Sequence, residues 1–152
     1  MNGKKIKPQF ISVPFKADSG SGATEYNGIA KFSSAGIVIE FDSVLLGLIG
    51  GEVKEVQVAL DEILDIKFRK GIYKFFAQIQ LRLKNFTKLS QLPNYSGKVK
   101  LKIKREDYKL ADEAVAKLNK DIIENRKSLS PTHTPVSRLL NDSESETKDL
   151  EG

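Results

Sequence analysis

The 152-residue sequence contains no cysteine and a single histidine, His133. Without cysteine the chain has no disulfide framework, no thiolate nucleophile and no cysteine-based metal site, and the lack of disulfides fits a reducing compartment. Long apolar runs are also missing: the N-terminal segment is positively charged but has no hydrophobic signal core, and no stretch reaches transmembrane length. We therefore expect a cytoplasmic protein.

Residue patterns that indicate catalysis are absent as well. The Ser-Gly-Ser-Gly run at 19–22 lacks the Lys-Ser/Thr ending of a phosphate-binding loop. His133 lies between two prolines in a polar segment, where a solvated side chain is a simpler interpretation than a base or a metal ligand. The paired carboxylates are sequence neighbours, which point in different directions on a strand or helix: Asp61/Glu62, Glu106/Asp107 and Asp112/Glu113. We expect no enzyme, no metal and no cofactor.

The composition predicts one folded domain with a polar tail. An apolar content of 39% in 152 residues allows a single core of ordinary size. Residues 126–152 are rich in Ser, Thr, Pro and acids and have almost no apolar periodicity, so we expect them to be disordered. The tail holds four basic and five acidic residues, and residues 1–125 hold the other 21 basic and 15 acidic ones. The domain at 1–125 is therefore the basic part.

Residues 9–105 show the pattern of a β-rich fold. Alternating apolar and polar residues, rich in β-branched and aromatic types and separated by turn residues, predict seven strands. These are Gln9–Lys16, Gly28–Ser33, Ile37–Asp42, Lys54–Leu60, Ile63–Arg69, Lys74–Lys84 and Lys98–Arg105.

After the last predicted strand the apolar period changes to that of a helix. From Tyr108 to Ile122, apolar residues recur at spacings of three and four, which places them on one stripe of a helix over about Glu106–Asn125. Acids in the first turn and Lys117 and Lys120 further on suit the helix dipole. We expect an amphipathic helix that covers a sheet.

Seven strands followed by one helix is an element order that resembles bacterial pleckstrin-homology-like (GRAM-like) domains of uncharacterised function. The resemblance covers about residues 25–125 and depends on Gly36–Phe41, Val58–Ile63, Leu92-Pro93 before Gly97–Ile103, and Arg105–Asp107 opening a helix with Ala111 and Ala114. It implies a mainly β fold with one C-terminal α-helix: a roll in which seven antiparallel strands form a partly open barrel capped by the helix. Phosphoinositide recognition in this family usually needs several basic residues across the first hairpin. Only Lys16 and Lys31 are basic here, so we do not expect specific inositol-phosphate binding.

The last three predicted strands place their basic residues on one face. In the segment 98–105, apolar and basic residues alternate, so a buried apolar side would leave the lysines in solvent. If these strands are neighbours, they form a basic outer face that binds an anionic partner or simply keeps the sheet soluble. Only Phe76 offers an aromatic surface there, so nucleic acid is not the expected partner. The candidate residues are Lys67, Arg69, Lys74, Arg82, Lys98, Lys100, Lys102 and Lys104.

The most apolar stretch, Val44–Gly51, lies between the third and fourth predicted strands. Its glycines suit a hairpin connection, and Leu45, Leu46, Leu48 and Ile49 either form an exposed contact loop or fold back over the open end of the barrel. The first alternative adds an apolar anchor to the basic face. The sequence thus favours a non-catalytic module that binds a protein or peptide, and this partner can be a second copy of the chain. The alternative is a peripheral module on an anionic membrane surface.

Overall fold

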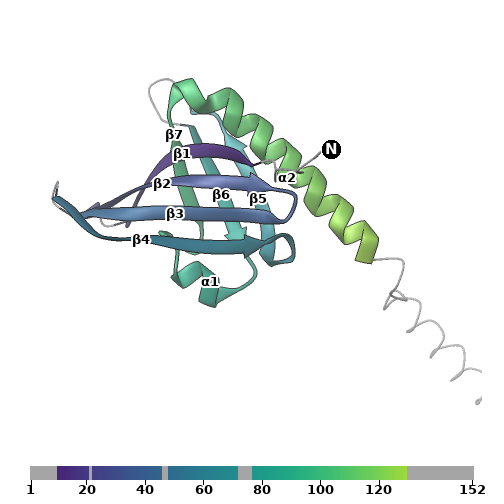
Figure 1. Ribbon diagram of the computed structural model, residues 1–152, viewed down its shortest axis with the longest axis horizontal. Coiled ribbons are helices and arrows are strands. Elements are labelled where there is room, and N and C mark those ends of the chain that lie inside the picture. The colour runs from purple at the N-terminus through teal and green to yellow at the C-terminus, as the bar shows by residue number, and fades with distance from the viewer. Residues whose placement is uncertain (1–9, 21, 46–47, 72–76, 130–152) are drawn as a thin grey trace, which may run out of the picture. The chain divides into compact units, whose positions relative to one another are not determined.

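The computed structural model describes residues 10–20, 22–45, 48–71 and 77–129 (Figure 1). As predicted, these residues form a mainly β fold with a long helix after the last strand. The strands are β1 (Ile11–Asp18), β2 (Thr24–Ser33), β3 (Gly36–Leu45), β4 (Leu48–Ala59), β5 (Ile63–Arg69), β6 (Ala77–Leu83) and β7 (Val99–Ile103). The helices are α1 (Phe86–Ser90) and α2 (Tyr108–Leu129), with short 3-10 turns at Leu60–Glu62 and Arg105–Asp107.

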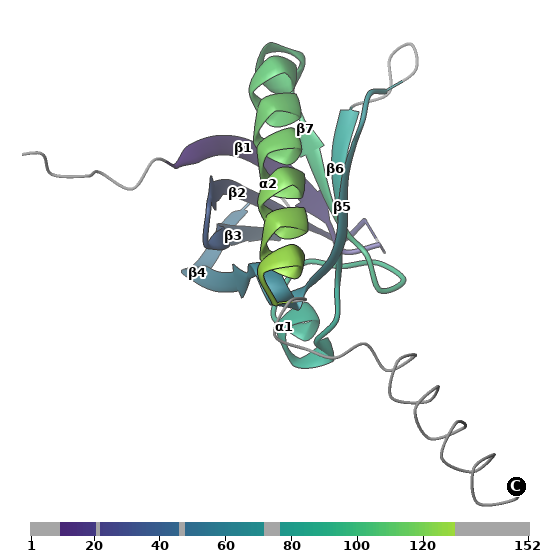
Figure 2. The ribbon, with the colours of Figure 1, turned by 90° about the vertical axis from the view of Figure 1, so that its right-hand side faces the viewer.

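The strands form one antiparallel sheet in the order β4-β3-β2-β1-β7-β6-β5. Its two halves, β1–β4 and β5–β7, are joined through β1 and β7, which share the single register pair Lys16↔Lys102. The strands of the first half cross those of the second (Figures 1 and 2). Because β4 and β5 lie at opposite edges of the strand order, the sheet is a partly open barrel.

The core lies between these two halves and is formed by the side chains that alternate with outward-pointing ones along each strand. In β1, for example, Val13, Phe15 and Ala17 are buried and the residues between them point outward. The other strands contribute further buried aliphatic and aromatic residues to the same cluster. The predicted apolar stripe of α2 completes it, with Ala111, Ala114, Val115, Leu118 and Ile122 buried. The helix therefore caps the barrel, as the spacing of its apolar residues predicts.

The short helix α1 was not predicted. Asn85 precedes it, and its Oδ1 accepts hydrogen bonds from the main-chain N–H groups of Thr87 and Lys88 at 2.8 and 3.4 Å, as an N-cap residue does. A helix of five residues is too short to give an apolar periodicity. The signal that sequence reasoning missed is this cap.

Several element boundaries differ from the prediction. β2 begins at Thr24, before the expected Gly28, and α2 ends at Leu129, beyond Asn125. The stretch Val44–Gly51 is mostly strand and not a long hairpin connection, because β3 and β4 stay paired as far as Leu45↔Leu48. Leu48 and Ile49 therefore begin β4.

The chain divides into two units, Met1–Ile122 and Ile123–Gly152. The first contains the whole sheet and the part of α2 that carries the buried stripe. The second contains the last residues of α2. The expected tail at 126–152 begins inside α2, and its residues 130–152, including His133, lie outside the described part of the chain. The predicted domain boundary at residue 125 remains a prediction.

Candidate functional site

The outer surface of β5, β6 and β7 brings the predicted basic residues together. These strands are neighbours, as expected, and two cross-strand rows run over their outer side: Arg69–Gln78–Lys102 and Lys67–Gln80–Lys100. Ile66, Ile79 and Leu101 are buried on the opposite side. We name Lys67, Arg69, Arg82, Lys98, Lys100 and Lys102 the basic face. Lys104 follows β7, and Lys74 lies outside the described residues.

Two cations of the basic face are paired with carboxylates: Arg82 with Asp65 of β5, and Lys102 with Asp18 of β1. Nε of Arg82 lies 2.9 Å from Oδ2 of Asp65, and Nη2 of Arg82 donates to the same oxygen. The Arg82 hydrogen bond lowers the pKa of Asp65 against the opposing effect of desolvation, and the charges of Arg82, Lys67 and Lys98 lower this pKa further. Asp65 is also the only acid within the described parts of β5–β7. Lys67, Arg69, Lys98 and Lys100, which are in no ion pair among the described residues, keep the face positive.

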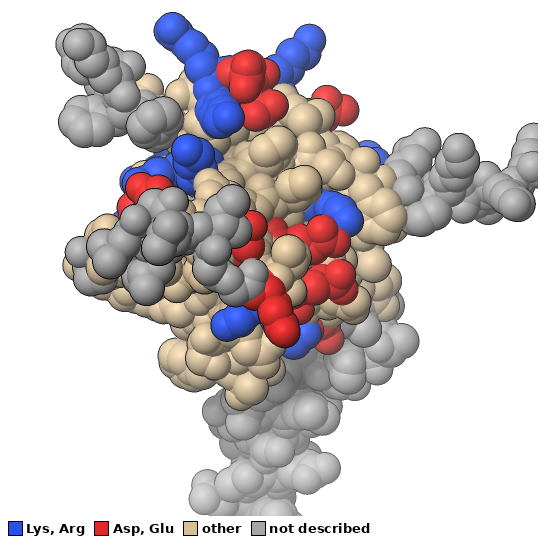
Figure 3. Space-filling view, turned by 60° about the vertical axis from the view of Figure 1, so that its left-hand side comes forward, with Lys and Arg blue, Asp and Glu red and all other residues tan. Residues whose placement is uncertain are grey.

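The outer surface of the other half of the sheet has the opposite charge. In the regularly paired parts of β2–β4, the outward positions are those that alternate with the buried residues. Their charged residues are Glu25, Lys31, Glu40, Asp42 and Glu55. Nζ of Lys31 lies 2.7 Å from Oε1 of Glu40 and neutralises it. Figure 3 shows a group of acidic side chains on the face that it presents. The net charge of +5 is thus distributed unevenly.

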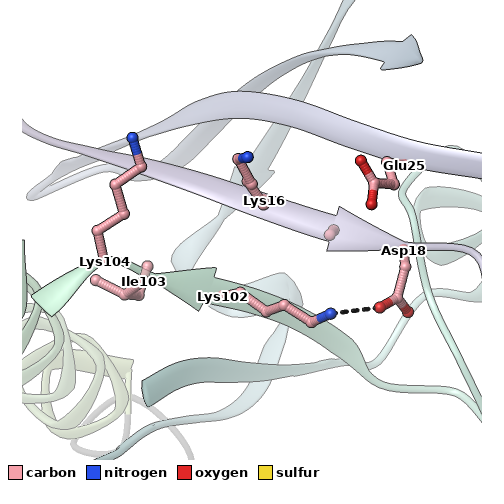
Figure 4. Close-up of a pocket in the computed structure, with 7 residues that line it drawn as sticks. Lys16, Asp18, Glu25, Lys102, Ile103 and Lys104 are labelled. Atoms are coloured by element: carbon pink, nitrogen blue, oxygen red, sulfur yellow. Dashed lines mark hydrogen bonds and ion pairs between the residues drawn. The ribbon is translucent and has the colours of Figure 1, made fainter. Parts of the chain in front are cut away.

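A cleft lies where β1 and β7 diverge, at the junction of the basic and acidic halves. Two adjacent hollows of about 260 and 200 Å³ share Lys16, Lys102 and Lys104 in their linings. The larger hollow is also lined by Asp18 and Glu25. Figure 4 shows Lys104 at one end, the carboxylates of Asp18 and Glu25 at the other, and the ammonium group of Lys16 between them. We name these five residues the β1–β7 cleft.

Like charges face each other twice in the β1–β7 cleft. Lys16 is the register partner of Lys102, and Asp18 is the register partner of Glu25. Directly opposed like charges destabilise a strand pair. An ion pair of 2.6 Å between Nζ of Lys102 and Oδ2 of Asp18 relieves one charge of each pair (Figure 4). Among the described residues, no ion pair engages Lys16, Lys104 or Glu25.

Sequence reasoning found Lys102 and Lys104 but missed the other three residues of the cleft. The sequence pattern assigns Lys16 only to the first hairpin, and it does not single out Asp18 or Glu25. The cleft depends on the pairing of β1 with β7, which are 86 residues apart at the Lys16–Lys102 contact point. A local pattern contains no information on this pairing, although the Asp18↔Glu25 opposition follows from the hairpin alone.

Of the predicted apolar contact loop, the structure describes only the backbone of Leu45, Leu48 and Ile49. Leu45 and Leu48 pair at the end of the β3–β4 hairpin, but the side chains of Leu45, Leu48 and Ile49, and all of Leu46, lie outside the described residues. Whether these side chains are exposed stays a prediction.

In the part of the chain that the structure describes, no group of three or more His, Asp or Glu side chains is placed to hold a metal ion. No described helix combines the length and apolar character needed to cross a membrane. Comparisons with protein-family models, with curated proteins and with solved structures each found no match.

Proposed function

We propose that this protein is a non-catalytic binding module that holds an acidic protein or peptide segment on its basic face. The observation that carries the proposal is the separation of charge between strands β5–β7 and strands β2–β4 of one sheet. The outward positions of β5–β7 have Asp65 as their single acid, whereas those of β2–β4 have Lys31 as their single base in the regularly paired parts. A surface that only kept the protein soluble would not need such a separation.

The geometry of the basic face suits an extended acidic segment. Lys67 and Lys100 lie two strands apart in one row, and Arg69 and Lys102 lie two strands apart in the next. Adjacent strands are about 4.8 Å apart, so each row spans about 10 Å. Rows of this spacing offer several separate contacts to the carboxylates of one partner. Such contacts accelerate association and select against basic partners.

The alternative of a peripheral membrane module draws on the apolar end of the β3–β4 hairpin. That hairpin, however, belongs to the acidic half of the sheet, and the exposed Glu52 follows its tip in β4. An anionic bilayer would repel these acids. The charge distribution therefore favours an acidic protein partner over a membrane.

The resemblance to pleckstrin-homology-like domains supports the same kind of function. Seven antiparallel strands and a capping helix are the architecture that this resemblance implies, and a non-catalytic binding role is what we infer from it. Because one fold serves many functions, the charge on the basic face, and not the fold, defines the expected partner. The proposal includes self-association, in which the basic face of one copy would contact the acidic outer surface of β2–β4 of another.

Binding of a labelled poly-glutamate peptide, followed by fluorescence anisotropy, tests the proposal. The triple variant Lys67→Gln, Arg69→Gln, Lys98→Gln removes three exposed cations of the basic face. We expect it to weaken binding about tenfold, because three contacts of roughly 0.5 kcal/mol each are lost. Binding by the wild type should also weaken as salt is raised, because salt screens exposed charges.

A matched control removes the same charge elsewhere. Lys109, Lys117 and Lys120 are exposed on α2, and their triple replacement by Gln should leave binding nearly unchanged. Equal losses in the two variants would show that only net charge matters, and would contradict a binding face. Wild-type binding to phosphatidylserine vesicles but not to poly-glutamate would favour the membrane alternative.

A further inference from the structure

We infer that the β1–β7 cleft binds a phosphomonoester group, presented by a peptide whose next residue is basic. This inference rests on the proposed function and names a specific feature of the partner. It begins from the unbalanced charges of the cleft. The Lys102–Asp18 ion pair of 2.6 Å joins two of the five charges of the cleft. Lys16, Lys104 and Glu25 are in no ion pair among the described residues.

The combined charge of the two unpaired lysines matches that of a phosphomonoester. Lys16 and Lys104 provide two positive charges that line both hollows, with Lys16 between Lys104 and the carboxylates (Figure 4). A phosphomonoester carries about −1.5 to −2 charges near neutral pH, whereas a carboxylate carries one. Lysine ammonium groups bind phosphates well as point charges. A carboxylate of Asp or Glu would leave one of the two lysines without a partner.

The size of each hollow suits a group and not a whole ligand. The hollows have volumes of about 260 and 200 Å³, and each alone is below the range of about 300 to 1,000 Å³ typical of sites that enclose a drug-sized molecule. The cleft also continues into the basic face, because Lys102 belongs to both. A phosphorylated side chain can therefore enter the cleft while the rest of an acidic peptide crosses the outer rows of β5–β7.

Glu25 selects the charge of the side chain that lies beside the phosphate. It is exposed, lines the larger hollow and has no ion pair in the described part of the chain. It would repel a second anion next to the phosphate and attract a Lys or Arg side chain. A uniformly anionic bilayer places anions at both ends of the cleft, so a phosphopeptide with a basic neighbour is the better match.

Four labelled peptides that differ at two positions test this inference by fluorescence anisotropy. They contain phosphoserine-Lys, serine-Lys, glutamate-Lys and phosphoserine-Glu in one neutral sequence. The wild type should bind phosphoserine-Lys at least about tenfold more tightly than each of the others. Inorganic phosphate should compete with this peptide. Equal binding of glutamate-Lys and phosphoserine-Lys would overturn the inference.

Variants assign the binding to the cleft. The double variant Lys16→Gln, Lys104→Gln should lose the preference for phosphoserine over glutamate, and Glu25→Gln should lose the preference for Lys over Glu beside the phosphoserine. A matched control, Lys109→Gln with Lys117→Gln, should retain both preferences. Retention of both preferences by the cleft variants would overturn the inference, even if their overall affinity fell. Unchanged circular dichroism and thermal unfolding would show that each variant is folded.

Three further outcomes separate this inference from the proposed function. If poly-glutamate binding depends on Lys67, Arg69 and Lys98 but the phosphoserine preference is absent, the proposed function stands and the inference fails. If wild-type protein binds phosphatidylserine vesicles through Lys16 and Lys104 but ignores the phosphopeptide, a membrane occupies the cleft and the inference also fails. Loss of poly-glutamate binding in the cleft variant alone would contradict the basic face as the main contact.

Discussion

Nδ2 of Asn119 in α2 donates a 3.3 Å hydrogen bond to the main-chain carbonyl oxygen of Ile66 in β5. The carbonyl belongs to a strand at one edge of the open sheet. At the opposite edge, Nζ of Lys88 in α1 donates to the main-chain carbonyl oxygen of Gln57 in β4 and also lies 3.5 Å from Oε1 of Glu62. Each helix thus places one side chain on an edge strand, where a further strand would otherwise pair.

We predict that removing both contacts promotes self-association. Asn119→Ala with Lys88→Ala frees a carbonyl group on each edge strand, so strands from another copy can pair there. Loss of the Asn119 hydrogen bond should also lower the free energy of unfolding by about 0.5 to 1.5 kcal/mol. Light scattering after size exclusion, over a range of concentrations, measures the first effect, and urea unfolding measures the second.

Lys120→Ala is the control for this pair, because Lys120 is exposed and adjoins Asn119 on α2. It should change neither the molar mass nor the urea midpoint appreciably. A double variant with the same mass as the wild type at every concentration would show that the two contacts do not protect the edges.

A second contact between α2 and the sheet predicts a larger loss of stability. The main-chain N–H of Ala77 donates to the hydroxyl oxygen of Tyr108 at 3.2 Å, and Ala77 is fully buried. Tyr108→Phe keeps the ring, which packs edge-on against Phe68, but leaves the buried N–H without this acceptor. We expect a loss of about 1 to 3 kcal/mol in the free energy of unfolding, measured with urea.

Tyr95→Phe provides the comparison for Tyr108→Phe. Tyr95 is 55% exposed, so water replaces any partner of its hydroxyl group and the urea midpoint should hardly change. Equal effects of the two substitutions would mean that the Ala77 N–H finds another acceptor, and that the Tyr108 hydroxyl does not hold α2 on the sheet.

Local patterns were sufficient to predict most of the fold. Alternation located all seven strands, since each strand has one buried side, and the change of period after Arg105 located α2. The prediction failed at the glycines of 44–51, which it assigns to a connection because glycine weakens strands. In the structure, Gly50 lies in β4 and pairs with Ser43 of β3. The register also shifts between Phe41 and Ser43, which indicates a bulge where glycine is acceptable.

The candidate site was only half predictable. The residues of the basic face follow from alternation, because the outward side of a strand is visible once its apolar side is known. The cleft requires the Lys16↔Lys102 pairing, which depends on how the two halves of the sheet cross. Sequence reasoning also could not show that Asp65 and Asp18 neutralise Arg82 and Lys102, since these pairs join different strands.

Gly28 in β2 is predicted to tolerate no side chain. A Cβ at this position would lie 2.2 Å from the main-chain oxygen of Glu40 and 2.6 Å from the ring of Phe15. Gly28→Ala should therefore lower the free energy of unfolding by about 1 to 3 kcal/mol, as overpacked cores do. Thermal and urea unfolding measure this change.

A second substitution separates the two contacts of Gly28. Phe15→Leu removes the ring but not the Glu40 oxygen, so adding it to Gly28→Ala should relieve only part of the strain. Full relief in this background, after correction for the effect of Phe15→Leu alone, would mean that the main chain shifts easily at Glu40 and that only the ring needs glycine.

The ion pair of Asp65 with Arg82 predicts a dependence of stability on pH. Because the Arg82 hydrogen bond lowers the pKa of Asp65 from its usual value of 3.8, the unfolded chain takes up this proton at a higher pH than the folded protein. The pair therefore stabilises the fold above the unfolded-state pKa, and this contribution is lost as pH falls through the folded-state pKa.

Asp65→Asn should lower the urea midpoint slightly at pH 7, since the pair is partly exposed, and the difference from wild type should shrink below about pH 4. Asp112→Asn, at an exposed helical position, is the control. A difference between Asp65→Asn and wild type that stayed constant from pH 7 to pH 2 would show that the carboxylate charge does not contribute.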